Sequence, residues 1–128
     1  MSHITVSYPK DKNTPVSHLP FSPAVRVGDL IFVSGQASVD ASGNLMPGSF
    51  ESEFRRSVEN LQKVLKSAGS DLVHVIHTRN YVRDPANLPE FNRLYREYFF
   101  APCPARTTIT RCLPETLHFE IECIAVPA

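Results

Sequence analysis

The chain has 128 residues, of which 42% are apolar, and its thirteen basic and thirteen acidic residues give a formal net charge of zero. This length fits one domain, residues 1–128, and the apolar content is enough for one core. Because no basic run or acidic tail favours nucleic acid or a membrane surface, the balance indicates small-molecule chemistry. A domain of this size buries only about two-thirds of its unfolded surface, so self-association is a natural way to gain stability.

Two features bear on the compartment. Residues 10–13, Lys-Asp-Lys-Asn, stand where a signal peptide needs an apolar segment, and nowhere do 18 apolar residues follow one another. Cys103, Cys112 and Cys123 are odd in number and have no C-x-x-C spacing, which is typical of reduced thiols. We therefore expect a cytoplasmic protein.

The first half of the chain predicts a lead, a hairpin and a helix. Residues 1–19 read as a loose lead. The segments 24–27 and 30–36, separated by Gly28 and Asp29, predict a β-hairpin. Ser49 is a candidate N-cap, and a helical apolar stripe follows it until Gly69 supplies a left-handed stop. The stripe consists of Phe54, Val58, Leu61 and Leu65.

The second half predicts a strand, a helix and two strands. The strand around residues 73–82 is followed by a second helix near Asn87, and then by strands over 107–113 and 117–126. A turn near Pro114 and Glu115 is expected to join the last two as a second hairpin. The order β-β-α-β-α-β-β predicts an α+β fold, a mixed sheet with two helices on one face. The last strand is apolar on one side and amphipathic on the other, so its second side is a candidate subunit interface.

Two side chains are candidates for catalysis. Arg106 follows Cys103-Pro104-Ala105 at the start of a strand, where its guanidinium can clamp a carboxylate, although an exposed arginine is the simpler interpretation. Glu120 lies between Phe119 and Ile121, where burial would raise its pKa for acid–base work, although it can equally face solvent beside Glu122.

Weaker candidates surround these two. Gly35 has no side chain to block a ligand from its backbone N–H, and Ser34 precedes it at the end of a strand. Asn92 lies on the second helix, either near a ligand or on the plain surface. His74 and His77 are the one close histidine pair, and three residues apart in a strand they point to opposite faces, so no metal site is expected.

A turn near Pro114 would hold Arg106 and Glu120 about 10 Å or more apart within one hairpin, at ~3.4 Å per residue. If both serve one small substrate, each site would combine Arg106 of one subunit with Glu120 of another. Phosphate-loop, dinucleotide and serine-hydrolase motifs are missing from the sequence.

Four segments in order resemble the Rid (YjgF) family of enamine/imine deaminases across about residues 20–126: SPAVRVGDLIFVSGQ, NYVRDPANLPEFNRLYREYFF, PARTTI and FEIECIAV. The resemblance implies a chorismate-mutase-like fold, a homotrimeric barrel with clefts between subunits, and no cofactor. It also implies that Arg106 grips the substrate carboxylate, that Glu120 activates a water, and that Ser34, Gly35 and Asn92 line the cleft.

The implied activity is hydrolysis of small reactive enamines and imines such as 2-aminoacrylate to a 2-oxo acid and ammonia. Two departures bear on the substrate. Phe21 and Pro23 stand where many deaminating members have Tyr and Gln, and Thr108 stands where the best-known members have Cys. A larger conjugated enamine such as 2-aminomuconate, or a non-catalytic trimer that binds carboxylates, remain the alternatives.

Overall fold

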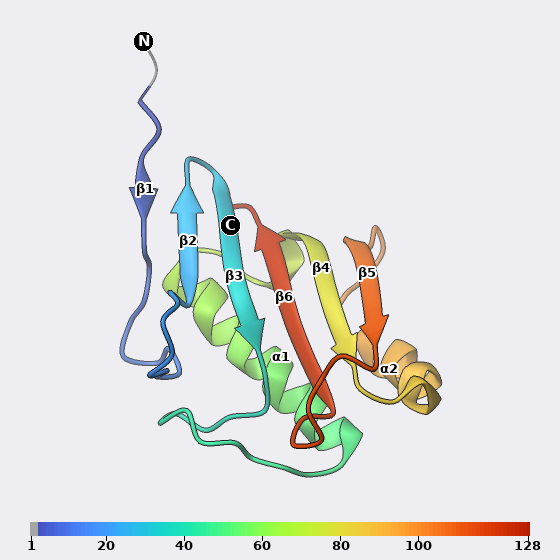
Figure 1. Ribbon diagram of the computed structural model, residues 1–128. Coiled ribbons are helices and arrows are strands. Elements are labelled where there is room, and N and C mark those ends of the chain that lie inside the picture. Colours follow the sequence, from blue (N-terminus) through green and yellow to red (C-terminus); the bar gives the residue numbers. More distant parts are fainter. Residues whose placement is uncertain (1–2) are drawn as a thin grey trace.

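The computed structural model describes residues 3–128, which form two α-helices and one six-stranded sheet (Figure 1). This confirms the α+β prediction. In chain order the elements are β1 (Val6–Ser7), β2 (Ala24–Val27), β3 (Leu30–Gln36), α1 (Phe50–Ser67), the 3-10 turn η1 (Leu72–His74), β4 (Val75–Val82), the 3-10 turn η2 (Pro85–Asn87), α2 (Leu88–Tyr95), β5 (Ala105–Thr110) and β6 (Phe119–Ala125).

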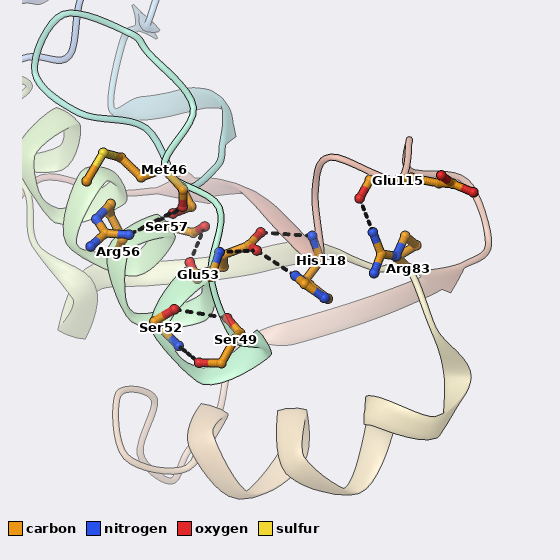
Figure 2. A network of polar contacts seen from close by, with 11 residues as sticks. Met46, Ser49, Ser52, Glu53, Arg56, Ser57, Arg83, Glu115 and His118 are labelled. Atoms are coloured by element: carbon orange, nitrogen blue, oxygen red, sulfur yellow. Dashed lines mark hydrogen bonds and ion pairs between the residues drawn. The ribbon is translucent and has the colours of Figure 1, made fainter.

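Helix α1 begins and ends where local chemistry places it. The Ser49 side chain accepts a hydrogen bond of 3.1 Å from the backbone N–H of Ser52, which satisfies one of the free donors at the helix start (Figure 2). Gly69 has a φ of +81°, the left-handed conformation that ends a helix at little steric cost. The predicted cap and stop are thus confirmed.

Both helices cover the same face of the sheet because of its connectivity. The strand order is β1-β2-β3-β6-β4-β5, and β3, β4 and β5 run parallel to one another. The connections β3-α1-β4 and β4-α2-β5 advance across the sheet in one direction. Since such crossovers are right-handed, both helices fall on one side. Figure 1 shows α1 behind the sheet and the opposite face uncovered.

The predicted hairpin between the last two strands is wrong. β5 pairs in parallel with β4 at the sheet edge, whereas β6 lies between β3 and β4 and is antiparallel to both. The short β4-α2-β5 crossover places β5 along one edge of β4, so β6 pairs with the other edge. The first predicted hairpin, β2 with β3, is confirmed.

The core lies between the helices and this covered face. Phe54 of α1 is fully buried, with its ring centroid 4.8 Å from that of Phe119 in β6 and 6.1 Å from that of Phe91 in α2. Phe54 therefore joins both helices to the sheet. In β6, alternate residues from Phe119 to Ala125 are buried, as the predicted apolar parity requires.

The lead contributes more structure than its sequence indicates. Val6–Ser7 pairs with β2 at the sheet edge, and the backbone N–H of Val16 donates to the carbonyl of Ala41 at 3.1 Å.

In the part of the chain that the structure describes, no helix combines the length and apolar character needed to cross a membrane.

Truncation of the central core side chain tests this packing. We expect Phe54→Ala to lower the free energy of unfolding by about 3–5 kcal/mol, because it leaves a cavity among three elements. Urea denaturation followed by circular dichroism measures the loss. Val73→Ala, at a side chain that is 79% exposed, is the control and is expected to change stability by less than about 0.5 kcal/mol.

Candidate functional site

The candidate site residues fall into two cavities. One of about 530 Å³ is lined by Phe21, Ser34, Gly35 and Glu120. The other, of about 230 Å³, is lined by Asn92 and Arg106. We call these the Glu120 cavity and the Arg106 cavity.

Arg106 is held by aromatic rings of α2. Its guanidinium carbon lies 4.9 Å from the ring centroid of Tyr95 and 5.1 Å from that of Phe91. Such stacking orients the plane of the guanidinium and leaves its N–H edge free to pair with a carboxylate. Asn92, on the same helix, adds an amide to this cavity. The Arg106 cavity is therefore suited to an anionic group.

A buried hydrogen-bonded chain supports this platform. The Tyr95 hydroxyl lies 2.8 Å from that of Thr78 on β4, and the Asn80 side-chain amide donates to Thr78 at 3.0 Å. Thr78 is the β4 residue in register with Arg106. Burial raises the pKa of the Tyr95 hydroxyl, which is protonated near neutral pH even without this shift. The Tyr95 ring below Arg106 is thus held at its hydroxyl end by Thr78 and at its other end by helix α2.

Glu120 has the environment of an acid–base group. Burial raises the pKa of its carboxyl above the usual range, and the negative charge of Glu122 raises it further. Ser34 donates from its hydroxyl to the carbonyl of Ser22 at 2.6 Å, which ties the segment just before β2 to the lining of this cavity. A carboxyl with a raised pKa exchanges protons at pH values closer to neutrality.

Gly35 is required for the position of Glu120. A Cβ added at Gly35 would lie 2.5 Å from the Glu120 Oε1 atom, closer than any ordinary contact. The absence of a side chain therefore lets the carboxylate lie against the backbone of β3. This close approach, and not an unusual backbone angle, is the physical reason for a glycine here.

Arg106 and Glu120 face opposite sides of the sheet. Arg106 is in register with Thr78 and contacts α2, so it lies on the covered face. Glu120 is in register with Tyr81 and alternates with the buried Phe119 and Ile121, so it lies on the uncovered face. Within one chain, the two side chains do not meet.

The remaining candidate, Thr108, is half-buried on β5, on the same face as Arg106, but it is not among the residues that line either cavity. Sequence reasoning also missed lining residues. Tyr95 has no sequence signal beyond its apolar spacing on α2, and Leu19 and Leu45 come from segments without regular structure. Cys103 also lines the Arg106 cavity, and its place three residues before Arg106 in the sequence is the signal that could have identified it.

The fold and the two cavities define a small α+β protein whose candidate site residues line surface cavities, and comparison with known proteins identifies its family. The model of the family described as Endoribonuclease L-PSP matches residues 11–127. The chain therefore belongs to this family, the Rid (YjgF) family, as its sequence motifs predict.

Three relatives show how close the similarity is. The chain is 35% identical to the 2-iminobutanoate/2-iminopropanoate deaminase of Mus musculus, over 98% of this chain and 95% of the mouse protein. Among solved structures, YEO7_yeast superposes with a TM-score of 0.89 at 30% identity, covering 97% of this chain and 100% of the yeast chain. E. coli TdcF, solved with bound serine, gives 0.83 at 25% identity, covering 95% and 99%.

The close approach at Gly35 can be tested directly. We expect Gly35→Ala to fold normally, because an ordinary contact of 3.4 Å is restored once the flexible Glu120 carboxylate retreats. The carboxylate then sits about 1 Å from its original place, a misplacement that can cost on the order of 10²-fold in rate. Thermal unfolding and kcat/KM with an imine substrate measure the two effects. Full activity in this variant would contradict the assignment.

Proposed function

We propose that this protein is a cofactor-independent deaminase of small reactive enamines and imines, which yields a 2-oxo acid and ammonia. The observation that carries this proposal is the half-buried Glu120, with its raised pKa, in an open cavity beside Gly35. The stacked Arg106 supports it, because substrates derived from amino acids bring a carboxylate. A relative of this chain carries a deaminase name, and another binds serine.

We propose further that the working unit is a homotrimer with each site between two subunits. Arg106 and Glu120 lie on opposite faces of one sheet, so a single small substrate reaches both only when two chains contribute. The uncovered face also carries exposed apolar side chains, with Leu30 and Phe32 each 40% exposed and Ile109 37% exposed. Apolar residues on one sheet face are typical of a surface that packs against another chain.

In the proposed reaction, an enamine first tautomerises to the imine. Arg106 of one subunit holds the carboxylate and so orients the C=N carbon beside Glu120 of the next. As ionised Glu120 takes a proton from water, the oxygen attacks that carbon to give a carbinolamine. The protonated Glu120 gives that proton to the nitrogen, which completes the neutral carbinolamine. It then takes the proton of the carbinolamine hydroxyl and passes it to the nitrogen, so that the C–N bond breaks, ammonia leaves and the carbon becomes a ketone. Water supplies the oxygen, and no redox step is needed.

The cavity gives one specific reason to consider a larger substrate. Phe21 and Leu19 line it together with Leu45, and its volume of about 530 Å³ exceeds what a three-carbon enamine fills. A conjugated enamine such as 2-aminomuconate would use this space, but its second carboxylate would meet no lysine or arginine among the lining residues. We therefore favour small or apolar imines.

Cys103 and Cys112 are exposed free thiols, which supports the proposed cytoplasmic location.

The role of Arg106 is tested by substitution. We expect Arg106→Ala to lower kcat/KM for 2-aminoacrylate, generated in situ by a dehydratase, at least ~100-fold, because a charge-assisted carboxylate pair is lost. Release of 2-oxo acid and ammonia is measured above the spontaneous rate. Arg93→Ala, at a side chain of α2 that is 59% exposed, is the control and should retain activity. Ligand binding without any acceleration by wild type would instead indicate a carboxylate-binding protein.

Mixing inactive variants tests the shared site. If Arg106 and Glu120 act across an interface, trimers reassembled from equal amounts of Arg106→Ala and Glu120→Gln regain about one quarter of wild-type activity, because one site in four then pairs two intact halves. Sites contained within one chain would give no recovery. Sedimentation of the mixture verifies that reassembly has occurred.

A further inference from the structure

A buried carboxylate outside both cavities makes three polar contacts. Glu53, in the first turns of α1, is 1% exposed. Its Oε1 accepts from the backbone N–H of His118 at 2.9 Å, and its Oε2 accepts from that of Gly48 at 3.0 Å. The same Oε2 lies 2.5 Å from His118 Nδ1 (Figure 2). Because an ionised carboxylate only accepts, Nδ1 carries the hydrogen in this contact. A buried carboxylate persists only with such partners.

These partners connect Glu53 to two walls of the Glu120 cavity. Gly48 ends the loop between β3 and α1, whose residues 37, 39, 43 and 45 form one wall. His118 directly precedes β6 and lies two residues before Glu120, which forms the other. One carboxylate on α1 therefore holds the loop and the start of β6 together.

Neighbouring residues on α1 hold the loop but do not reach His118. Arg56 donates to the Ser38 hydroxyl at 3.0 Å, and Asn60 donates to the Ala37 carbonyl at 2.9 Å. These two follow Glu53 by three and seven residues, so all three lie on one face of the helix. The contact with His118 belongs to Glu53, which makes this residue the link between the rigid helix and the strand of the candidate acid.

The tolerance for movement at Glu120 is small. The Glu120 carboxylate occupies the space that a side chain at Gly35 would need. An extended strand rises by about 3.4 Å per residue, so His118 lies only about 7 Å along the chain from Glu120. A shift of β6 by a fraction of an ångström therefore changes both the burial of this carboxylate and its distance from a bound substrate.

We propose that Glu53 and His118 form a positioning pair that fixes the Glu120 carboxylate against Gly35. Breaking the pair displaces that carboxylate while the sheet remains folded. The consequence for catalysis rests on the proposed function, whereas the consequence for the position of Glu120 does not. Glu53 and His118 touch no substrate in this scheme and act through Glu120.

The position of Glu120 can be measured without any substrate. Burial is the main cause of the raised pKa of Glu120, so displacement into solvent lowers that pKa toward its usual value. We expect NMR titration of the Glu120 carboxyl to show a pKa lower by about half a pH unit or more in Glu53→Gln and His118→Leu. His118→Asn, which keeps a donor for Glu53, should stay near wild type. An unchanged pKa in His118→Leu would overturn the proposal.

Ser70→Ala is the matched control, because it removes a buried contact at the opposite end of β6 from His118. The Ser70 hydroxyl donates to the carbonyl of Val126 at 2.6 Å, just beyond the far end of β6, and Ser70 is 5% exposed. We expect this variant to lose thermal stability but to keep the pKa of Glu120. An equal fall in the pKa of Glu120 would mean that any loosening of β6 suffices, and would refute a specific pair.

Kinetics separate this inference from the proposed function. We expect His118→Leu to lower kcat about tenfold with KM within about twofold, because binding through Arg106 is untouched. In a Glu120→Gln background the same substitution should cause no further loss, whereas an additive loss would contradict action through Glu120. A wild type that accelerates no imine hydrolysis would refute the deaminase proposal and leave the NMR result to decide on the pair.

Discussion

The handedness of two parallel crossovers governs the layout of this protein. Because β3-α1-β4 and β4-α2-β5 advance in one direction across the sheet, both helices are confined to one face. The aromatic core around Phe54 fills the space between the layers, and the other face is left with Glu120 and several exposed apolar side chains. Arg106 and Glu120 are separated by the same layout, because strand register places Arg106 on the face that the helices cover and Glu120 on the uncovered face. This separation is the reason for our proposal that a complete site takes residues from two chains.

The two candidate catalytic groups lie in opposite kinds of environment. Arg106 lies over aromatic rings, whose faces favour a cation, and its guanidinium is thereby oriented for an anion. Glu120 loses solvent and faces the like charge of Glu122, which makes its ionised form less stable than in water. The Arg106 cavity therefore favours binding of an anion, and the Glu120 cavity favours exchange of a proton. This division of labour matches the chemistry of a substrate with a carboxylate at one end and a C=N bond beside it.

Much of the fold could be predicted from local sequence, because caps, stops and periodicity act over a few residues. Ser49, Gly69 and the α1 stripe predict that helix, and the alternation in β6 predicts its buried side. Strand partners could not be predicted in this way. A turn near Pro114 indicates a hairpin, but the pairing of β5 with β4 depends on the competing crossover through α2. The motifs indicated Arg106, Glu120 and Gly35, whereas Glu53 carries no sequence signal, since a glutamate in a helix is usually solvated.

The placement of β6 has a consequence for how the chain folds. It is the last strand in sequence, yet it lies between β3 and β4 and joins the two halves of the sheet. During synthesis, β2 and β3 can pair early as a hairpin, but β4 has no partner on its inner edge until Phe119–Ala125 has left the ribosome. Long-range pairing of this kind is slow compared with local contacts. Until then the apolar faces of α1 and β3 lack their main cover, so the nascent chain depends on its final segment for protection from aggregation.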